Sequence, residues 1–187
     1  FFRDTVNAAN PNKHAGMIYA SNLCHEIAQN VGFTNLAEEI INEDGTITTK
    51  TNTGDMVTCN LNSISLGRIT DEELEENIAL QIRMLDNVIS INQAPVPESR
   101  MTSDKYRAIG LGTSGYHHYL VNHDIQWESD EHIEVADKLF ENIAFYAIKA
   151  SMELAKEKGA YPAFKGSEWE TGEYFTRRGY TSDRWKQ

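Results

Sequence analysis

Apolar residues recur with the period of an α-helix along a segment that begins near Thr70. They form one stripe along the expected helix, at Leu74, Ile78, Ile82, Leu85 and Ile89. A second stripe, at Leu80, Met84 and Val88, predicts that this helix is buried on more than one side. Thr70 and Glu73 have the spacing of a capping box. Pro95 and Pro97 predict the end of the helix and a linker over residues 98–104.

A longer amphipathic pattern predicts a second helix from Ser129 to Gly159. Its apolar positions are Ile133, Ala136, Phe140, Ile143, Ala147, Ala150 and Leu154. Acidic residues lie near its amino end and lysines in its last turn, as the helix dipole favours, and Gly159 is expected to be a left-handed cap. A shorter helix is expected from Tyr116 to about Asn122.

Strand signals are short and rich in β-branched residues. They lie at Met17–Leu23, at Thr46–Thr49 after an Asp44-Gly45 turn, at Met56–Leu61, and at Ala108–Gly112 as a short strand or turn. These strands do not add up to a self-sufficient sheet and need partner strands. The pattern therefore predicts a helix-rich α/β chain, and its irregular first residues and abrupt end lead us to expect a piece of a longer protein.

The composition narrows the class of protein. With 187 residues the chain can form one domain or part of one, and its 40% hydrophobic content fits a globular protein. A net charge of -11 disfavours nucleic acid and membrane surfaces as partners. No apolar stretch approaches the roughly 20 residues that cross a bilayer. Two cysteines, Cys24 and Cys59, suit a reducing compartment, so a soluble cytoplasmic protein is expected.

Two motifs resemble ligand-binding motifs, but packing explains each of them more simply. Residues 110–115 spell G-x-G-x-x-G, yet a dinucleotide site needs a longer preceding strand and an acidic residue after a second strand, so tight strand-to-helix packing is favoured. His117 and His118 are adjacent, and adjacent residues on a helix point about 100° apart. We therefore expect packing or surface histidines, and no metal site.

The segment Ser21-Asn22-Leu23-Cys24-His25-Glu26 carries the strongest chemical signal. It places an amide, a thiol and a carboxylate at alternate positions, which in an extended segment face the same way. An amide can orient a hydroxyl group, a carboxylate can move its proton, and a thiol can act as a nucleophile or hydrogen-atom donor. A buried structural cysteine beside a capping asparagine would give the same pattern. Cys59 is a small hydrophobic residue unless its segment lies beside Cys24, where it could supply reducing equivalents.

Four segments taken together resemble the large catalytic (alpha) subunit of the ribonucleotide reductases, in the same order. They are Ala20–Ile27, Cys59–Ile64, Arg107–Gly112 and Ala155–Gly159. Residues 164–175 look most like the class Ib branch. The similarity covers nearly the whole chain but only a middle portion of the family's much longer chain.

The resemblance implies part of a ten-stranded α/β barrel, over residues 1–187, whose finger loop lies near residues 21–27. Cys24 would be the thiyl radical, Glu26 the base on the 3'-hydroxyl group and Asn22 the residue that orients the sugar. Cys59 would be one thiol of the reducing pair. Substrate contacts would come from Ser21, Asn22, Leu23, Cys24, His25 and Glu26.

The resemblance also implies partners that this chain does not contain. These are a ribonucleoside diphosphate substrate, a small subunit with a di-metal tyrosyl radical, the rest of the large subunit, and a thioredoxin- or glutaredoxin-type reductant. The resemblance places the allosteric specificity site outside this chain, and no cofactor is expected in the chain itself. Alone, the chain is expected to be inactive.

Three other hypotheses stay open. The chain could be a non-catalytic remnant or a complementing fragment of a split gene. It could belong to a cobalamin-dependent reductase, which shares the finger-loop motif. A dinucleotide-binding domain is the least favoured of the three.

Overall fold

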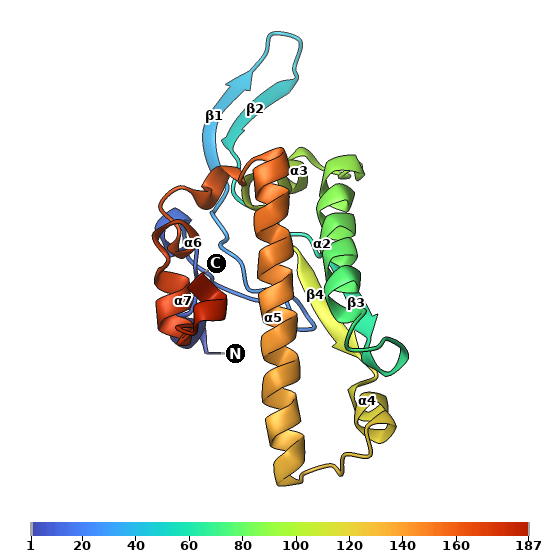
Figure 1. Ribbon diagram of the computed structural model, residues 1–187. Coiled ribbons are helices and arrows are strands. Elements are labelled where there is room, and N and C mark those ends of the chain that lie inside the picture. The colour runs from blue at the N-terminus through green and yellow to red at the C-terminus, as the bar shows by residue number, and fades with distance from the viewer. Residues whose placement is uncertain (1, 187) are drawn as a thin grey trace. The chain divides into compact units, whose positions relative to one another are not determined.

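The computed structural model describes residues 2–186, which form two compact units, each assembled from separate stretches of chain (Figure 1). The first unit contains residues 2–58, 93–107 and 161–186. The second contains residues 59–92 and 108–160. Cys24 belongs to the first unit and Cys59 to the second.

The second unit contains a two-stranded parallel sheet. Strand β3 (Leu61–Ser65) pairs with β4 (Gly110–Ser114), from Leu61 opposite Gly110 to Ser65 opposite Ser114. The chain leaves β3 through the short helix η2 (Leu66–Arg68) and passes through α2 (Leu74–Ile91) before it returns to β4, as parallel strands require. The strand predicted at Met56–Leu61 is wrong except at its last residue, because residues 56–60 are irregular and β3 begins at Leu61. Strand β4 starts two residues later than the predicted Ala108–Gly112.

Helices α2 and α5 (Asp130–Lys158) lie side by side and run parallel in the second unit (Figure 1). The first predicted stripe of α2 is confirmed as buried, and Ile78 is fully buried in a core shared with β3, α4 (Tyr116–Asn122) and α5. The second stripe is not buried, because Leu80, Met84 and Val88 are 55%, 51% and 42% exposed. The prediction of burial on more than one side of α2 is therefore wrong among the described residues.

The helix ends follow local rules. Thr70 N donates to Glu73 Oε2 over 2.9 Å, which is one half of the predicted capping box. Ser129 Oγ caps α5 by accepting from His132 N over 3.1 Å. Gly159 has a positive φ of 91°, but its ψ of 155° is not that of a left-handed helical cap. No helix within residues 2–186 combines the length and apolarity needed to span a membrane.

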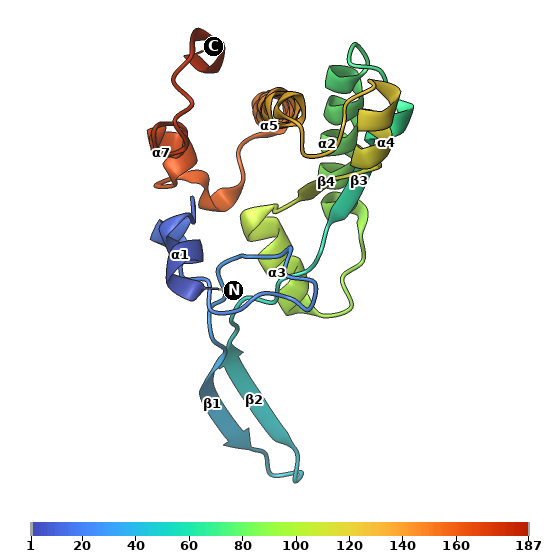
Figure 2. The same ribbon diagram turned by 90° about the horizontal axis from the view of Figure 1, so that it is seen from below.

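A β-hairpin projects from the first unit, away from α1 (Arg3–Ala8) and α3 (Pro97–Tyr106) (Figure 2). Strand β1 (Asn35–Ile41) pairs antiparallel with β2 (Ile47–Asn52), and all residues of both strands are exposed. The predicted strand at 46–49 is thus confirmed with its Asp44-Gly45 turn, where Thr46 N donates to Asp44 Oδ1 over 2.9 Å. Its partner β1 was not predicted, because Asn, Ala and Glu give it no strand signal.

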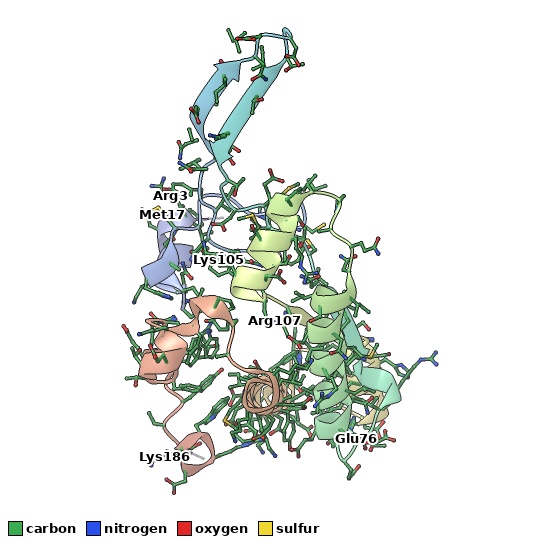
Figure 3. All side chains as sticks on the ribbon, turned by 90° about the horizontal axis from the view of Figure 1, so that it is seen from above. Arg3, Met17, Glu76, Lys105, Arg107 and Lys186 are labelled. Atoms are coloured by element: carbon green, nitrogen blue, oxygen red, sulfur yellow. The ribbon has the colours of Figure 1, made fainter. Side chains whose placement is uncertain are left out.

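Short helices make up the rest of the first unit. They are η1 (Lys13–Ala15), η3 (Pro162–Phe164), α6 (Glu168–Thr171), α7 (Glu173–Arg178) and η4 (Asp183–Lys186). The linker predicted over residues 98–104 is wrong: it is α3, because Pro97 occupies the first helical turn, where its missing N–H costs nothing. Lys105 on α3 (Figure 3) donates to Asp55 Oδ1 over 3.2 Å, so α3 holds the segment that follows the hairpin.

Candidate active site

The candidate residues lie on an irregular loop of the first unit, residues 16–34, between η1 and β1. The predicted strand Met17–Leu23 is absent there: the segment runs without helix or strand and ends in a turn. The two arms of the loop meet where Val31 N donates to Met17 O over 3.0 Å. The candidate residues therefore lie on a closed loop, not on a sheet.

A tight turn that contains Cys24 brings Asn22 and Glu26 together. His25 N donates to Asn22 O over 3.2 Å, and His25 has a φ of 65°, which few non-glycine residues adopt. Leu23 is 94% exposed in the turn, and Cys24 is also exposed. The left-handed residue thus reverses the chain directly after the exposed Cys24.

The Asn22 side chain organises this turn. Its Nδ2 donates to Glu26 Oε1 over 2.5 Å, and its Oδ1 accepts from Ile27 N over 3.0 Å. Ser21 Oγ donates to the same Oδ1 over 3.3 Å. One uncharged amide thereby fixes both the Glu26 carboxylate and the backbone that follows it.

The prediction that Asn22, Cys24 and Glu26 face the same way along an extended segment is wrong, although Asn22 and Glu26 do meet. The segment is not extended, since residues 23–25 form a turn with His25 in the left-handed region. In a turn, the side chains at the two ends approach each other because the backbone reverses. The turn carries an amide, a thiol and a carboxylate, which is a set suited to holding a hydroxyl group and moving a proton or hydrogen atom.

Cys59 is exposed at the start of the second unit. Its neighbour Asn60 is fixed to the segment before β4, since Asn60 Nδ2 donates to Ala108 O over 3.3 Å and Asn60 O accepts from Gly110 N over 2.9 Å. Because Cys24 and Cys59 belong to different units, their encounter stays a prediction.

The G-x-G-x-x-G motif serves packing between strands and helix. Gly110 and Gly112 lie within β4, and a Cβ on Gly110 would come within 2.3 Å of the Leu61 side chain on β3. Gly115 has a φ of 69° and precedes α4. The first glycines are thus inside a strand, whereas a dinucleotide site needs them in the loop after one.

The histidine pair lies on α4, where both residues are exposed. The His117 ring lies 6.1 Å from that of Trp127, and a Cβ on Gly67 would collide with the His118 ring. Within residues 2–186, His, Cys, Asp and Glu form no group of three that could hold a metal ion.

Two buried polar clusters of the first unit were not predicted. One consists of asparagine side chains at the arms of the loop, the buried Asn10 and Asn30 and the half-buried Asn7. The other surrounds Glu168, whose side chain is 2% exposed and lies 2.6 Å from both Lys13 Nζ and Arg177 Nη2. Burial acts to raise the pKa of Glu168, but the two cations outweigh it and hold that pKa below its usual value. The high frequency of asparagines before residue 31 is the sequence feature that could have indicated the asparagine cluster.

Comparisons with known proteins show the family to which the chain belongs. The family described as "Ribonucleotide reductase, barrel domain" matches residues 1–187. The chain is 52% identical over 193 residues to the ribonucleoside-diphosphate reductase subunit alpha of Treponema pallidum. The match covers 100% of this chain and 23% of that protein.

Similar proteins from other bacteria carry the same name. The subunit alpha of Helicobacter pylori strain J99 is 38% identical over 91% of this chain, and that of Chlamydia trachomatis is 38% identical over the same share. The chain spans 26% and 15% of these two proteins, about a quarter or less of their length. With its mixed helices and strands, and with a family match over residues 1–187, the chain belongs to the ribonucleotide reductase barrel-domain family as an α/β fragment of that barrel.

Proposed function

We propose that this chain is the part of a ribonucleoside-diphosphate reductase alpha subunit that carries the reacting cysteine and its base. The observation that supports the proposal most directly is the turn in which Asn22 Nδ2 donates to Glu26 Oε1 over 2.5 Å, with Cys24 exposed between them. Such a turn can enter a sugar-binding site with the thiol, the carboxylate and the amide facing one ribose.

The proposed reaction starts at Cys24. A thiyl radical on its Sγ abstracts the 3'-hydrogen of the ribose, so that an S–H bond forms as the C3'–H bond breaks. Glu26 accepts the proton of the 3'-hydroxyl group, and the 2'-hydroxyl group takes a proton from the reducing dithiol and leaves as water. Glu26 returns its proton to the 3'-oxygen when the sugar is reduced. Asn22 orients the sugar through a hydrogen bond and keeps the Glu26 carboxylate in place. Cys24 finally returns the hydrogen atom to C3' and is a thiyl radical again.

Reduction at C2' requires two electrons and protons. We assign them to a dithiol of which Cys59 is one member, which is oxidised to a disulfide as the deoxyribonucleotide and one water form. A thioredoxin- or glutaredoxin-type protein would then reduce the disulfide.

The proposal includes partners outside this chain. A small subunit would hold the di-metal tyrosyl radical and supply the oxidising equivalent to Cys24. The remaining part of the alpha subunit would complete the barrel and its nucleotide sites. The chain by itself would therefore be inactive.

The test measures reduction of a ribonucleoside diphosphate by the assembled enzyme that contains this chain. Cys24→Ser should lower turnover by at least about 10³-fold because no thiyl radical can form. Glu26→Gln should lower it by about 10²- to 10⁴-fold because the base is lost. Asn42→Ala is the control, since the Asn42 amide donates to Thr46 and Thr48 within the hairpin.

Cys59→Ser separates the two thiol roles. Repeated turnover should stop, while a substrate-derived radical should still be detectable by electron paramagnetic resonance, since hydrogen abstraction precedes reduction. Near wild-type nucleotide reduction by Cys24→Ser or Glu26→Gln would refute the site and favour a non-catalytic fragment.

A further inference from the structure

The loop that carries Cys24 has no helix or strand of its own to hold it, because residues 16–34 are irregular. A site that must place a reacting atom to within about 0.5 Å needs support from surrounding contacts. The support must come from side chains that bond to the arms of the loop, here defined as residues 16–18 and 30–31. Figure 3 labels Met17, in the first arm, and Arg3, at the start of α1.

Asn7 holds the first arm. Its Nδ2 donates to Ile18 O over 2.7 Å, and its Oδ1 accepts from Ile18 N over 2.9 Å. Ile18 is 2% exposed, so its backbone groups would be costly to leave without partners. One amide thus satisfies both backbone groups of Ile18, as a neighbouring strand would in a sheet.

Asn10 and Asn30 hold the second arm. Asn30, 3% exposed, accepts from Asn10 Nδ2 over 2.7 Å and donates to Asn12 O over 2.8 Å. Asn10 is 5% exposed, and its Oδ1 accepts from Asn12 N over 2.9 Å. The side chain of Asn30 is therefore fixed through both its donor and its acceptor.

Gly16 lets the two arms approach each other. It has a φ of 156° and a ψ of −166°, a conformation that is nearly restricted to glycine. A Cβ at this position would lie 3.2 Å from Asn30 Cβ, which is closer than ordinary contact. The first arm therefore packs directly against the side chain that fixes the second.

Both arms are held by one segment, residues 7–12, which is itself anchored. Glu168 N donates to Pro11 O over 2.9 Å, Arg177 Nη2 donates to Ala9 O over 2.9 Å, and Tyr161 Oη donates to Asn12 Oδ1 over 2.7 Å. The contacts thus form a continuous chain from α6 and α7 through residues 7–12 to the loop.

We infer that Asn7, Asn10 and Asn30 are positioning residues for the reaction at Cys24, an inference that rests on the function proposed above. They touch no reacting group and act through the backbone of the loop. Amides suit this task because they do not titrate and so fix the arms without placing a charge near the thiol and the carboxylate.

The first experiment measures kcat and KM of the assembled enzyme with a ribonucleoside diphosphate. Asn30→Ala and Asn10→Ala should each lower kcat by about 10- to 100-fold, because a shift of about 1 Å at a reacting atom can cost that much. KM should change by less than about threefold, and Asn42→Ala should match wild type in both. The double variant should lose little more than either single variant, since the two amides act as one unit.

The second experiment uses a pH profile, measured only where circular dichroism shows the variant to be folded, so that a general loss of stability does not contribute. In Asn30→Asp, a protonated carboxyl group can donate to Asn12 O in place of the amide, whereas a buried carboxylate cannot. The kcat of Asn30→Asp relative to wild type should therefore rise as the pH falls and decline as the pH rises. Asn7→Ala, at a less buried position, repeats the kcat measurement if Asn30→Ala does not fold.

The outcomes separate the inference from the proposed function. If Cys24→Ser is inactive while Asn10→Ala, Asn30→Ala and Asn7→Ala keep wild-type kcat, the positioning role is refuted and the reaction assignment stands. If Cys24→Ser keeps wild-type activity, the proposed function fails first. A flat ratio of Asn30→Asp to wild type across pH also counts against the inference.

Discussion

At the scale of single residues, the conformation of the candidate turn depends on the Asn22 side chain more than on the reactive groups. Asn22 links Glu26 to the backbone of Ile27, while His25 takes a left-handed conformation that reverses the chain. An aspartate in place of Asn22 would set two carboxylates side by side and lose the donor. An amide at position 22 has both a donor and an acceptor, so it fits both the Glu26 carboxylate and the Ile27 N–H.

Tyr119 gives a residue-scale prediction in the second unit. Burial, then the charge of Asp71, whose Oδ1 accepts from Tyr119 Oη over 3.2 Å, raises the pKa of Tyr119 to about 12. The folded state keeps this proton longer than the unfolded state, whose pKa is near 10. The stability that it contributes should be complete below about pH 10 and be lost as the pH rises towards 12.

Chemical denaturation of the protein between pH 9 and 12 checks this prediction, with Tyr119→Phe as the comparison. The free energy of unfolding should decline less steeply with pH in Tyr119→Phe than in wild type. Equal slopes in the two proteins would contradict the assignment.

At the scale of elements, α2 carries two apolar stripes, of which one is buried and the other is exposed. Ile78 and Ile82 are 0% and 4% exposed against the sheet and α5, whereas Leu80 and Met84 are about half exposed. Ion pairs lie along the contact with α5, as between Arg83 and Glu157 at 2.6 Å. The buried stripe, not the ion pairs, should dominate the stability of this helix pair, because exposed pairs are screened by water and salt.

Two neighbouring positions on α2 test this ranking. Ile78→Ala should lower the free energy of unfolding by about 2–5 kcal/mol, because it leaves a cavity in the core. Arg83→Ala should leave the denaturation midpoint close to that of wild type at 0.15 M salt. Urea denaturation of both variants measures the difference, and a larger loss in Arg83→Ala than in Ile78→Ala would reverse the ranking.

At the scale of the whole molecule, the first unit is held together by residues that are far apart in the sequence. The Glu168 carboxylate meets Lys13 and Arg177, and Arg177 also donates to Ala9. This ion cluster joins the segment that holds the candidate loop to α6 and α7. Its loss should weaken the support of the loop through residues 7–12.

The pH dependence of stability tests the cluster. The pKa of Glu168 is lowered in the folded state, so its contribution to stability is present above its ordinary pKa near 4.5 and is lost as the pH falls through the lowered value. Glu168→Gln should lower the melting temperature at pH 7 by about 5 °C or more. As the pH falls through that lowered value the two melting temperatures should converge, and a gap that widens on acidification in scanning calorimetry would oppose this assignment.

Several elements could be predicted from local rules alone. Helices α4 and α5, the buried stripe of α2 and the hairpin turn follow from periodicity, caps and turn residues that lie within a few positions of one another. Strand β1 and helix α3 were missed for a related reason. Their local signals are weak or ambiguous, and pairing with β2 or the placement of Pro97 decides their conformation.

The sequence by itself determined the candidate groups, Asn22, Cys24, Glu26 and Cys59, and the family resemblance that relates them. Only the tertiary structure decided that a turn, not an extended strand, brings Asn22 to Glu26, and that Asn7, Asn10 and Asn30 hold the loop. The physical reason is that hydrogen bonds between distant residues leave no periodic trace in the sequence. A residue type records what chemistry a position can do, whereas packing and backbone reversal determine which positions meet.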